Sequence, residues 1–117
     1  MKNNDSKSKS NNTYNGNSPV RVLAFLEAKE GKRQELLNIL VPIVEPSRKE
    51  EGNVSYVLNS STENPNEIMF DEVWSSKDTF DKHYESPQSY KNRESVGGLL
   101  VRPMEVKIYA EITEKHT

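Results

Sequence analysis

The sequence predicts an α+β domain with the ferredoxin-like split βαβ fold, in which helices cover one face of a four-stranded antiparallel sheet. Period-two alternation and helical periodicity follow one another in the order strand, helix, strand, strand, helix, helix, strand. The second and third strands are separated only by the turn-forming residues 62–66, which favours a hairpin. The chain has 117 residues, which is the length of one domain.

The first strand and the first helix are expected at Val20–Ala28 and Lys32–Glu51. Apolar side chains alternate on both faces of the strand, which indicates that both faces are covered. Pro42 and Pro46 interrupt the hydrogen-bond ladder of the helix and are expected to kink or shorten it. Gly52 then suits the left-handed conformation that follows many helices. The helix has an apolar stripe formed by Leu36, Leu37, Leu40, Val41 and Val44.

The second strand is expected at Asn53–Ser61, with one face formed by Val54, Tyr56 and Leu58. The third strand continues into a helix. Its inward face is formed by Ile68, Phe70, Glu72 and Trp74. Ser75 and Asp78 have the spacing of a capping box, which predicts a helix start. This helix carries Phe80, His83 and Tyr84 on one side.

The last helix and the last strand have clear boundaries in the sequence. Ser86 and Pro87 supply an N-cap and a first helical residue, and the helix is expected to end at Gly97-Gly98. Met104–Thr113 alternates apolar and polar residues and is the clearest strand signal in the chain.

Composition predicts three regions: a disordered polar tail over residues 1–19, the folded domain over 20–113 and a short polar tail over 114–117. Only 32% of the residues are hydrophobic, which gives a lone domain a thin core. In a monomer, the sheet face opposite the helices would be open to solvent. The apolar residues expected on this open face are Leu23, Phe25, Val57, Met69, Val73 and Tyr109. Because soluble monomers rarely expose such a patch, we expect a homodimer closed sheet to sheet, a dimeric α/β barrel.

Several classes of protein are disfavoured by composition. The net charge of −2 with mixed signs points to neither nucleic acid nor a membrane surface, and the absence of cysteine excludes disulfide and thiolate chemistry. No apolar run approaches the ~20 residues of a membrane span, and the N-terminus has no apolar signal region, so a cytoplasmic location is expected. The sequence also contains neither a phosphate-binding loop nor clustered metal ligands.

The candidate site lies where the third strand passes into a helix. A carboxylate at Glu72, an indole at Trp74 and an imidazole at His83 are expected to converge on one cavity. Tyr56, Tyr84, Tyr90 and Arg48 are further candidates for substrate contacts.

The segments Val44–Tyr56, Glu72–Trp74 and His83 with Ser86-Pro87 together resemble the antibiotic biosynthesis monooxygenase family, which includes small quinol monooxygenases. The resemblance covers about Val20–Thr113. It implies a dimeric barrel that oxidises an electron-rich phenol, anthrone or hydroquinone with O2 and without metal, flavin or haem. Haem-degrading members have an Asn on the first strand and a His on the last helical segment, and this sequence has neither.

For such an oxygenase, His83 is the expected general base, because imidazole changes charge near neutral pH. Glu72 would orient His83, and its partner could instead be Arg48 or Arg93. Trp74 would stack on a planar substrate, the three tyrosines would donate hydrogen bonds to it, and Arg48 would hold an anionic group. Each assignment has a structural alternative: a cavity-shaping histidine, a solvent-facing or intersubunit carboxylate, packed aromatic rings, and a helix-end cation.

The leading functional prediction is therefore a small dimeric oxygenase acting on a quinol-like or polycyclic phenol, with O2 and no cofactor. An isomerase that moves protons on a small carbonyl compound would use the same His83 and Glu72 without oxygen. A non-catalytic dimeric module that holds a ligand in the same cavity is the third alternative.

Overall fold

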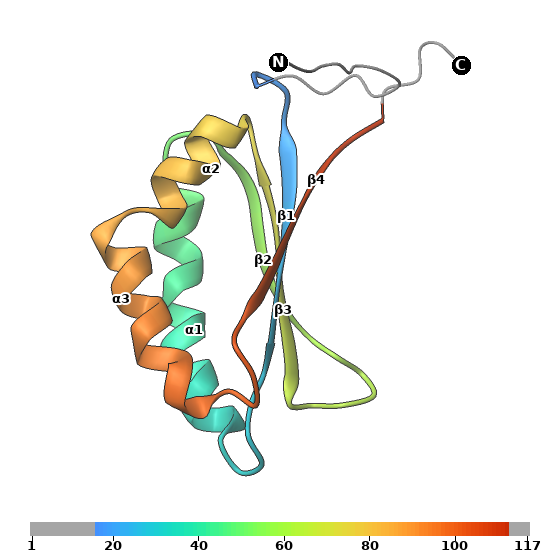
Figure 1. The fold of residues 1–117 in the computed structure, drawn as a ribbon, viewed down its shortest axis with the longest axis vertical. Helices are drawn as coiled ribbons and strands as arrows, with labels where there is room; N and C mark the ends of the chain where they lie inside the picture. The colour runs from blue at the N-terminus through green and yellow to red at the C-terminus, as the bar shows by residue number, and fades with distance from the viewer. Residues whose placement is uncertain (1–15, 113–117) are drawn as a thin grey trace, which may run out of the picture.

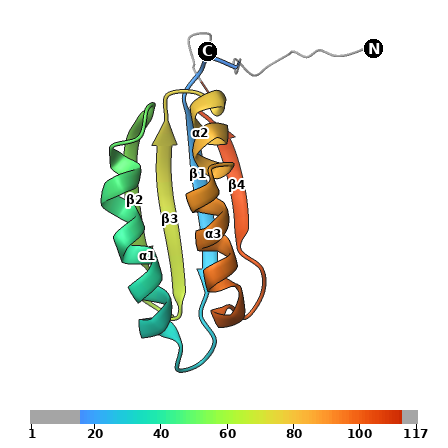
Figure 2. The same ribbon diagram turned by 90° about the vertical axis from the view of Figure 1, so that its left-hand side faces the viewer.

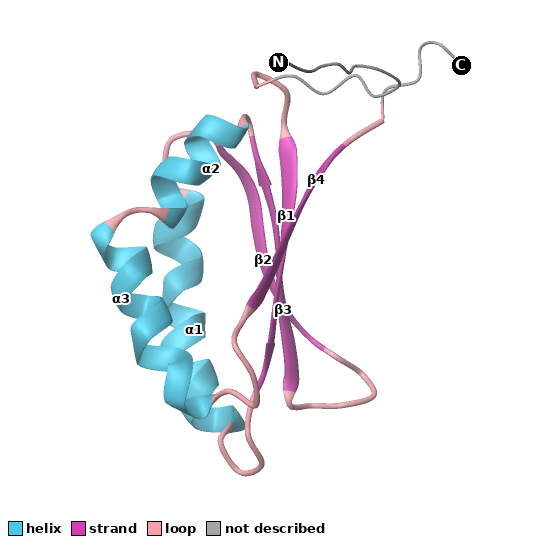
Figure 3. Cartoon of the chain, viewed as in Figure 1, coloured by secondary structure: helices cyan, strands magenta, loops and turns pink. Residues whose placement is uncertain are grey.

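The computed structural model describes residues 16–112 of the chain (Figure 3). Most of the predicted N-terminal tail (1–19) and all of the predicted C-terminal tail (114–117) lie outside the described residues. The predicted order of elements is found. The elements are β1 (Val20–Glu27), α1 (Arg33–Arg48), β2 (Asn53–Ser60), β3 (Glu67–Trp74), α2 (Lys77–Tyr84), α3 (Pro87–Val96), a 3-10 turn η2 (Gly97–Leu99) and β4 (Glu105–Ala110).

The four strands form one antiparallel sheet in the order β2-β3-β1-β4. All three helices lie on the same side of it (Figure 1). Seen from the helical side, α1 covers the β2–β3 half, and α2 and α3 cover the half that contains β1 and β4 (Figure 2). This topology confirms the predicted ferredoxin-like fold and places β1 and β3 at the centre of the sheet.

The two faces of the sheet differ in burial, as β1 shows. Its residues alternate between buried and more exposed positions, and Val20, Val22, Ala24 and Leu26 are buried beneath the helices. The opposite face has no covering element among residues 16–112. It carries the apolar residues predicted for the open face, of which Phe25, Val57 and Tyr109 remain 38%, 42% and 49% exposed.

Helix α1 runs through both of its prolines as a single helix and ends at Arg48, three residues earlier than expected. Pro42 and Pro46 lie on its exposed side, where water can satisfy the carbonyl groups that lose their amide partners. Leu36 and Leu40 are buried in the core, as the predicted stripe requires. Val41, which was predicted to belong to the same stripe, is 56% exposed, so its assignment to the stripe is wrong.

The predicted capping box of α2 is wrong by one residue. Ser76 is the N-cap, its hydroxyl accepts from the Thr79 amide at 3.1 Å, and the Thr79 hydroxyl accepts from the Ser76 amide at 3.3 Å. Threonine at this position performs the reciprocal role usually given to Glu or Gln. The true start fixes the helical phase that directs Phe80 and His83 inward.

Gly52 takes the left-handed conformation with φ of +84°, although it follows the end of α1 by four residues. Its carbonyl accepts a hydrogen bond from the Ser75 amide at 2.7 Å. A Cβ at this position would overlap the Thr79 side chain. The turn therefore packs directly against the start of α2, and glycine is required by both conformation and space.

Two strand predictions need correction. Val54 is 65% exposed and does not share the inward face of Tyr56, because a register shift between Asn53 and Ser55 leaves it as an extra residue. The last strand ends at Ala110 rather than reaching Thr113, which itself lies outside the described residues. Ile108 on this edge strand pairs with the buried Val22 but remains 42% exposed. The helices therefore cover only part of the apolar residues that made this strand clear in the sequence.

Candidate active site

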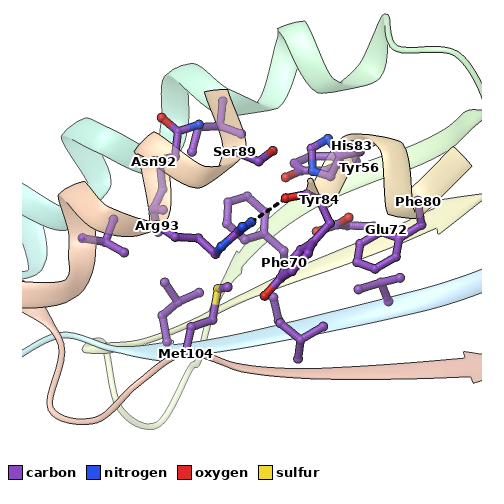
Figure 4. A pocket seen from close by; sticks show the side chains of 17 residues that line it. Tyr56, Phe70, Glu72, Phe80, His83, Tyr84, Ser89, Asn92, Arg93 and Met104 are labelled. Atoms are coloured by element: carbon purple, nitrogen blue, oxygen red, sulfur yellow. Dashed lines mark hydrogen bonds between the residues drawn. The ribbon is translucent and has the colours of Figure 1, made fainter. Parts of the chain in front are cut away.

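A small cavity of about 60 Å3 lies between the helical layer and the sheet (Figure 4). Its lining includes apolar side chains from β1, β3 and β4, among them Val22, Ala24, Phe70 and Val106. Polar side chains reach it mainly from β2, β3, α2 and α3, and they are Tyr56, Glu72, His83, Tyr84, Ser89, Asn92 and Arg93. The structure thus brings both predicted catalytic residues, His83 and Glu72, to one cavity.

His83 lies on the last turn of α2 with only 8% of its surface exposed. Three aromatic rings surround its imidazole: the ring centroids of Trp74, Tyr56 and Phe80 lie 4.7, 5.7 and 6.3 Å away. Packing of this kind holds the imidazole in one orientation.

The hydrogen-bond partner of His83 is Glu50, whose Oε1 lies 2.8 Å from Nδ1. The expected pairing of Glu72 with His83 is therefore wrong. Glu50 lies in the turn between α1 and β2, 33 residues away in sequence. Sequence reasoning missed it, because an exposed acid at the end of a helix carries no local sign of such a contact.

Glu72 is 4% exposed, and its Oε1 accepts a hydrogen bond from the Trp74 indole Nε1–H at 2.9 Å. Burial raises the pKa of Glu72 to about 7, the indole hydrogen bond acts in the opposite direction, and the charges of Glu50 and Asp71 raise it further. Neither Arg48 nor Arg93 pairs with this carboxyl group among the contacts of residues 16–112. Near neutral pH, Glu72 can therefore either hold or release a proton inside the cavity.

Tyr56 is 3% exposed, and burial is the main reason that its pKa is raised. The nearby Glu72 charge acts in the same direction, and a hydrogen bond with the Ser47 side chain opposes it. Tyr56 thus remains a neutral phenol at the cavity wall.

Tyr84 and Arg93 form another part of the lining, and both are half-buried. The Arg93 guanidinium lies 3.8 Å from the centroid of the Tyr84 ring, and its Nη1 donates a hydrogen bond to the Tyr84 carbonyl at 2.9 Å (Figure 4). This cation–π contact ties the end of α2 to α3 beside the cavity.

Three predicted substrate-binding residues do not line the cavity. Trp74 is completely buried beneath Glu72 and His83, so its ring has no open face for a substrate. Tyr90 is 59% exposed on α3. Arg48 donates from Nε to the Tyr56 carbonyl at 3.0 Å and from Nη1 to Glu45 at 2.8 Å, which makes it a support for β2.

Ser89, Asn92 and Arg93 line the cavity from α3. Neither Ser89 nor Asn92 was predicted from the sequence, which suggested Arg93 only as a possible partner of Glu72. Among the described residues, no three His, Asp or Glu side chains come close enough to hold a metal ion. Over the same part of the chain, no helix has the length and apolarity needed to cross a membrane.

Comparison with known proteins shows what the chain is similar to. The model of the family described as "Antibiotic biosynthesis monooxygenase" matches residues 19–93. A protein named "Putative monooxygenase Rv0793", from Mycobacterium tuberculosis, is 34% identical over 97 residues, which are 83% of this chain and 95% of that protein. "Uncharacterized protein sll1783" of Synechocystis is 32% identical over 99 residues, 85% of this chain and 67% of that one.

Solved structures agree with the sequence relatives. The structure of Rv0793 from Mycobacterium tuberculosis has a TM-score of 0.77 at 34% identity and covers 84% of this chain and 99% of that chain. A conserved protein from Methanosarcina mazei Go1 has a TM-score of 0.76 at 27% identity, with 82% of this chain and 95% of that chain covered.

Proposed function

The chain belongs to the antibiotic biosynthesis monooxygenase family, and from this premise and the cavity geometry we propose that it is a small cofactor-independent oxygenase. Its substrate is a quinol-like phenol, and its oxidant is O2. The name of the Mycobacterium tuberculosis relative supports monooxygenase chemistry.

One observation carries the proposal: two buried titratable side chains meet on an otherwise largely apolar cavity. His83 and Glu72 are 8% and 4% exposed, and both line the same space. Ionisable groups are seldom buried without a purpose, and perturbed groups inside clefts are typical of catalytic sites.

The size of the cavity favours a substrate with one ring over a polycyclic one. Its volume of about 60 Å3 is smaller than the ~150 Å3 of an engineered apolar cavity that binds benzene. Even a single ring therefore requires lining residues to move. The half-buried Tyr84, Arg93 and Met104 have the freedom to do so, whereas the fully packed sheet does not.

The reaction begins with proton transfer from a substrate hydroxyl to the imidazole of His83. The O–H bond breaks, and its electron pair stays on the substrate oxygen. The resulting anion is electron-rich enough to pass one electron to O2. Recombination of the two radicals forms a C–O bond to a peroxide, which takes back the proton from the His83 imidazolium. The O–O bond and the C–H bond of the same ring carbon then break as water leaves, and the quinone that remains carries one oxygen atom from O2. General-base assistance of this kind contributes typically ~10²–10⁴ in rate.

Glu72 and Tyr56 bind the substrate oxygens in this proposal. With a pKa of about 7, Glu72 can donate a hydrogen bond when protonated and accept one when ionised. Tyr56 contributes a neutral hydroxyl donor from the same wall of the cavity.

The homodimer is part of the proposal. The open sheet face carries large apolar side chains on all four strands, and Phe25, Val57 and Tyr109 are between 38% and 49% exposed. A second copy, placed sheet to sheet, would bury this face and close the back of the domain.

Oxygen consumption with a panel of substituted hydroquinones tests the function. The wild-type protein is expected to consume one O2 per quinol and to incorporate one labelled oxygen atom from ¹⁸O2 into the product. His83→Asn, which keeps a hydrogen-bonding amide but has no basic nitrogen, should lower kcat by about 10²-fold or more. Fluorescence of the single tryptophan, which packs on His83, reports whether this variant remains folded.

Two outcomes would reject the oxygenase. Turnover that persists under strict anoxia would favour the isomerase, because the movement of protons on a carbonyl substrate by His83 and Glu72 needs no oxygen. Tight binding of a phenol without turnover would favour a ligand-binding module. Unchanged kcat in His83→Asn would remove His83 as the base even if oxygen is consumed.

A further inference from the structure

Glu50 is the one charged side chain in hydrogen-bond contact with His83, and the reaction described above gives it no role. Its Oε1 lies 2.8 Å from His83 Nδ1, and within residues 16–112 the His83 ring makes no other hydrogen bond. The pair is asymmetric in exposure: the side chain of His83 is 9% exposed and that of Glu50 is 40% exposed. Glu50 therefore approaches the ring from the solvent side.

Backbone hydrogen bonds hold the α1–β2 turn that carries this carboxylate. The Glu50 amide donates to the Ser47 carbonyl at 3.1 Å, and the Glu50 carbonyl accepts from the Asn53 amide at 3.1 Å. The same turn is held against the start of α2 by the hydrogen bond between the Ser75 amide and the Gly52 carbonyl. The element that carries Glu50 is thus tied directly to the segment that leads into the helix of His83.

A second hollow, of about 300 Å3, lies on the outer side of the His83 ring. It runs between α1 and α3, and its lining includes Pro42, Gln88, Asn92, Glu50 and His83. Because His83 lines this hollow and the inner cavity as well, its ring forms part of the wall between them. Glu50 lines only the outer hollow, and within residues 16–112 its one hydrogen bond to a residue of the inner cavity is to His83, although its charge also raises the pKa of Glu72 there.

Other titratable or charged groups face His83 from neighbouring elements without bonding to its nitrogens. They are Glu72 from β3, Tyr56 from β2, Arg93 from α3 and Tyr84 from its own helix. Among the described residues, Glu50 is therefore the group in hydrogen-bond contact with a ring nitrogen of His83.

We propose that Glu50 is a positioning residue that sets the tautomer of His83. An ionised carboxylate can only accept hydrogen bonds, so the neutral imidazole must carry its proton on Nδ1. This leaves the Nε2 lone pair free to accept the substrate proton, in the step that rests on the proposed function. When Nε2 takes that proton the ring becomes an imidazolium, and the Glu50 carboxylate stabilises its new positive charge.

The tautomer can be measured without any substrate. Long-range ¹H–¹⁵N NMR at alkaline pH distinguishes a protonated Nδ1 from a protonated Nε2, and a His116→Gln background removes the signals of the only other histidine. The wild-type ring should show the Nδ1–H form, and Glu50→Ala should shift it mainly to the Nε2–H form that free imidazole side chains prefer. Glu51→Ala is the matched control, because it removes an exposed charge at the neighbouring position.

Kinetics separate positioning from mere structural support. Glu50→Ala should lower kcat at least about tenfold with little change in KM, because Glu50 does not line the substrate cavity. Glu50→Gln can still accept the Nδ1–H bond through its amide oxygen, so it should recover the tautomer and part of kcat. A structural role alone would not give this graded recovery in step with the NMR signal.

The two proposals can fail separately. An Nε2–H signal in the wild type, or an unchanged tautomer in Glu50→Ala, would overturn the role of Glu50 whatever the activity. If the quinol panel gives no oxygen uptake, the proposed function fails and the catalytic part of the inference fails with it. The tautomer experiment would then still decide whether Glu50 positions His83.

Discussion

Replacing Glu72 by glutamine should change how the stability of the protein depends on pH. Glu72 is 4% exposed, and burial raises the pKa of its carboxyl group to about 7. Glutamine has nearly the same volume and keeps an oxygen that can accept the Trp74 indole hydrogen bond. The substitution therefore removes ionisation while it preserves packing.

The sign and size follow from proton linkage. Because the pKa of Glu72 rises from 4.5 to about 7 on folding, the folded protein binds more protons than the unfolded chain between these two values. The contribution of Glu72 to the free energy of unfolding is therefore fully present below pH 4.5. It is lost as the pH rises through about 7. At 1.36 kcal/mol per pKa unit, the full loss is about 3 kcal/mol.

Urea unfolding followed by the fluorescence of the single tryptophan, at fixed protein concentration, measures this difference. Between pH 4.5 and 8, the wild type should lose about 3 kcal/mol more stability than Glu72→Gln. Other titrating groups are common to both proteins and cancel in the comparison. Glu51→Gln, which changes an exposed carboxylate, should follow the wild-type curve. Parallel curves for the wild type and Glu72→Gln would refute the reasoning that Glu72 is buried at a cost.

Three further predictions concern the frame of the site and the open face. Gly52→Ala should lower the free energy of unfolding by more than the ~1–3 kcal/mol of left-handed backbone strain, because its Cβ would overlap Thr79. Gly31 has φ of +81° and open space around it, so Gly31→Ala measures the backbone strain alone in the same urea experiment. Ser76→Ala should cost about 1 kcal/mol through the lost N-cap of α2, measured by thermal unfolding. Phe25→Asp should convert a dimer to a monomer in light scattering at micromolar concentration without loss of helical circular dichroism, and a monomeric wild type would contradict the dimer itself.

Local sequence signals carried most of the fold. The alternation in β1 and β3 and the Ser86-Pro87 start of α3 are properties of neighbouring residues, and the structure keeps them. Even the inward direction of Glu72 follows from period-two geometry on a strand. The local signals failed where neighbouring positions offered nearly equal choices, as for the N-cap of α2, which is Ser76 and not Ser75.

The contents of the site were less accessible to sequence reasoning. His83 and Glu72 were expected in one cavity, but the expected bond between them is replaced by contacts to Glu50 and Trp74. Tyr90 has the right chemistry for a substrate contact, yet the rotation of α3 leaves it 59% exposed. A helix turns by a fixed angle per residue, so only its packed orientation decides which of several polar side chains meets the cavity.

The sequence by itself determined the order of the elements, the antiparallel pairing of β2 with β3 and the apolar faces that require burial. These follow from hydrophobic periodicity and turn chemistry, which act between residues close together in the chain. Only the tertiary structure decided that Glu50 bonds to His83, that Trp74 lies beneath the site rather than in it, and that α3 supplies Ser89 and Asn92. Such contacts join side chains distant in sequence, and they depend on how the helices settle on the sheet, which no local pattern encodes.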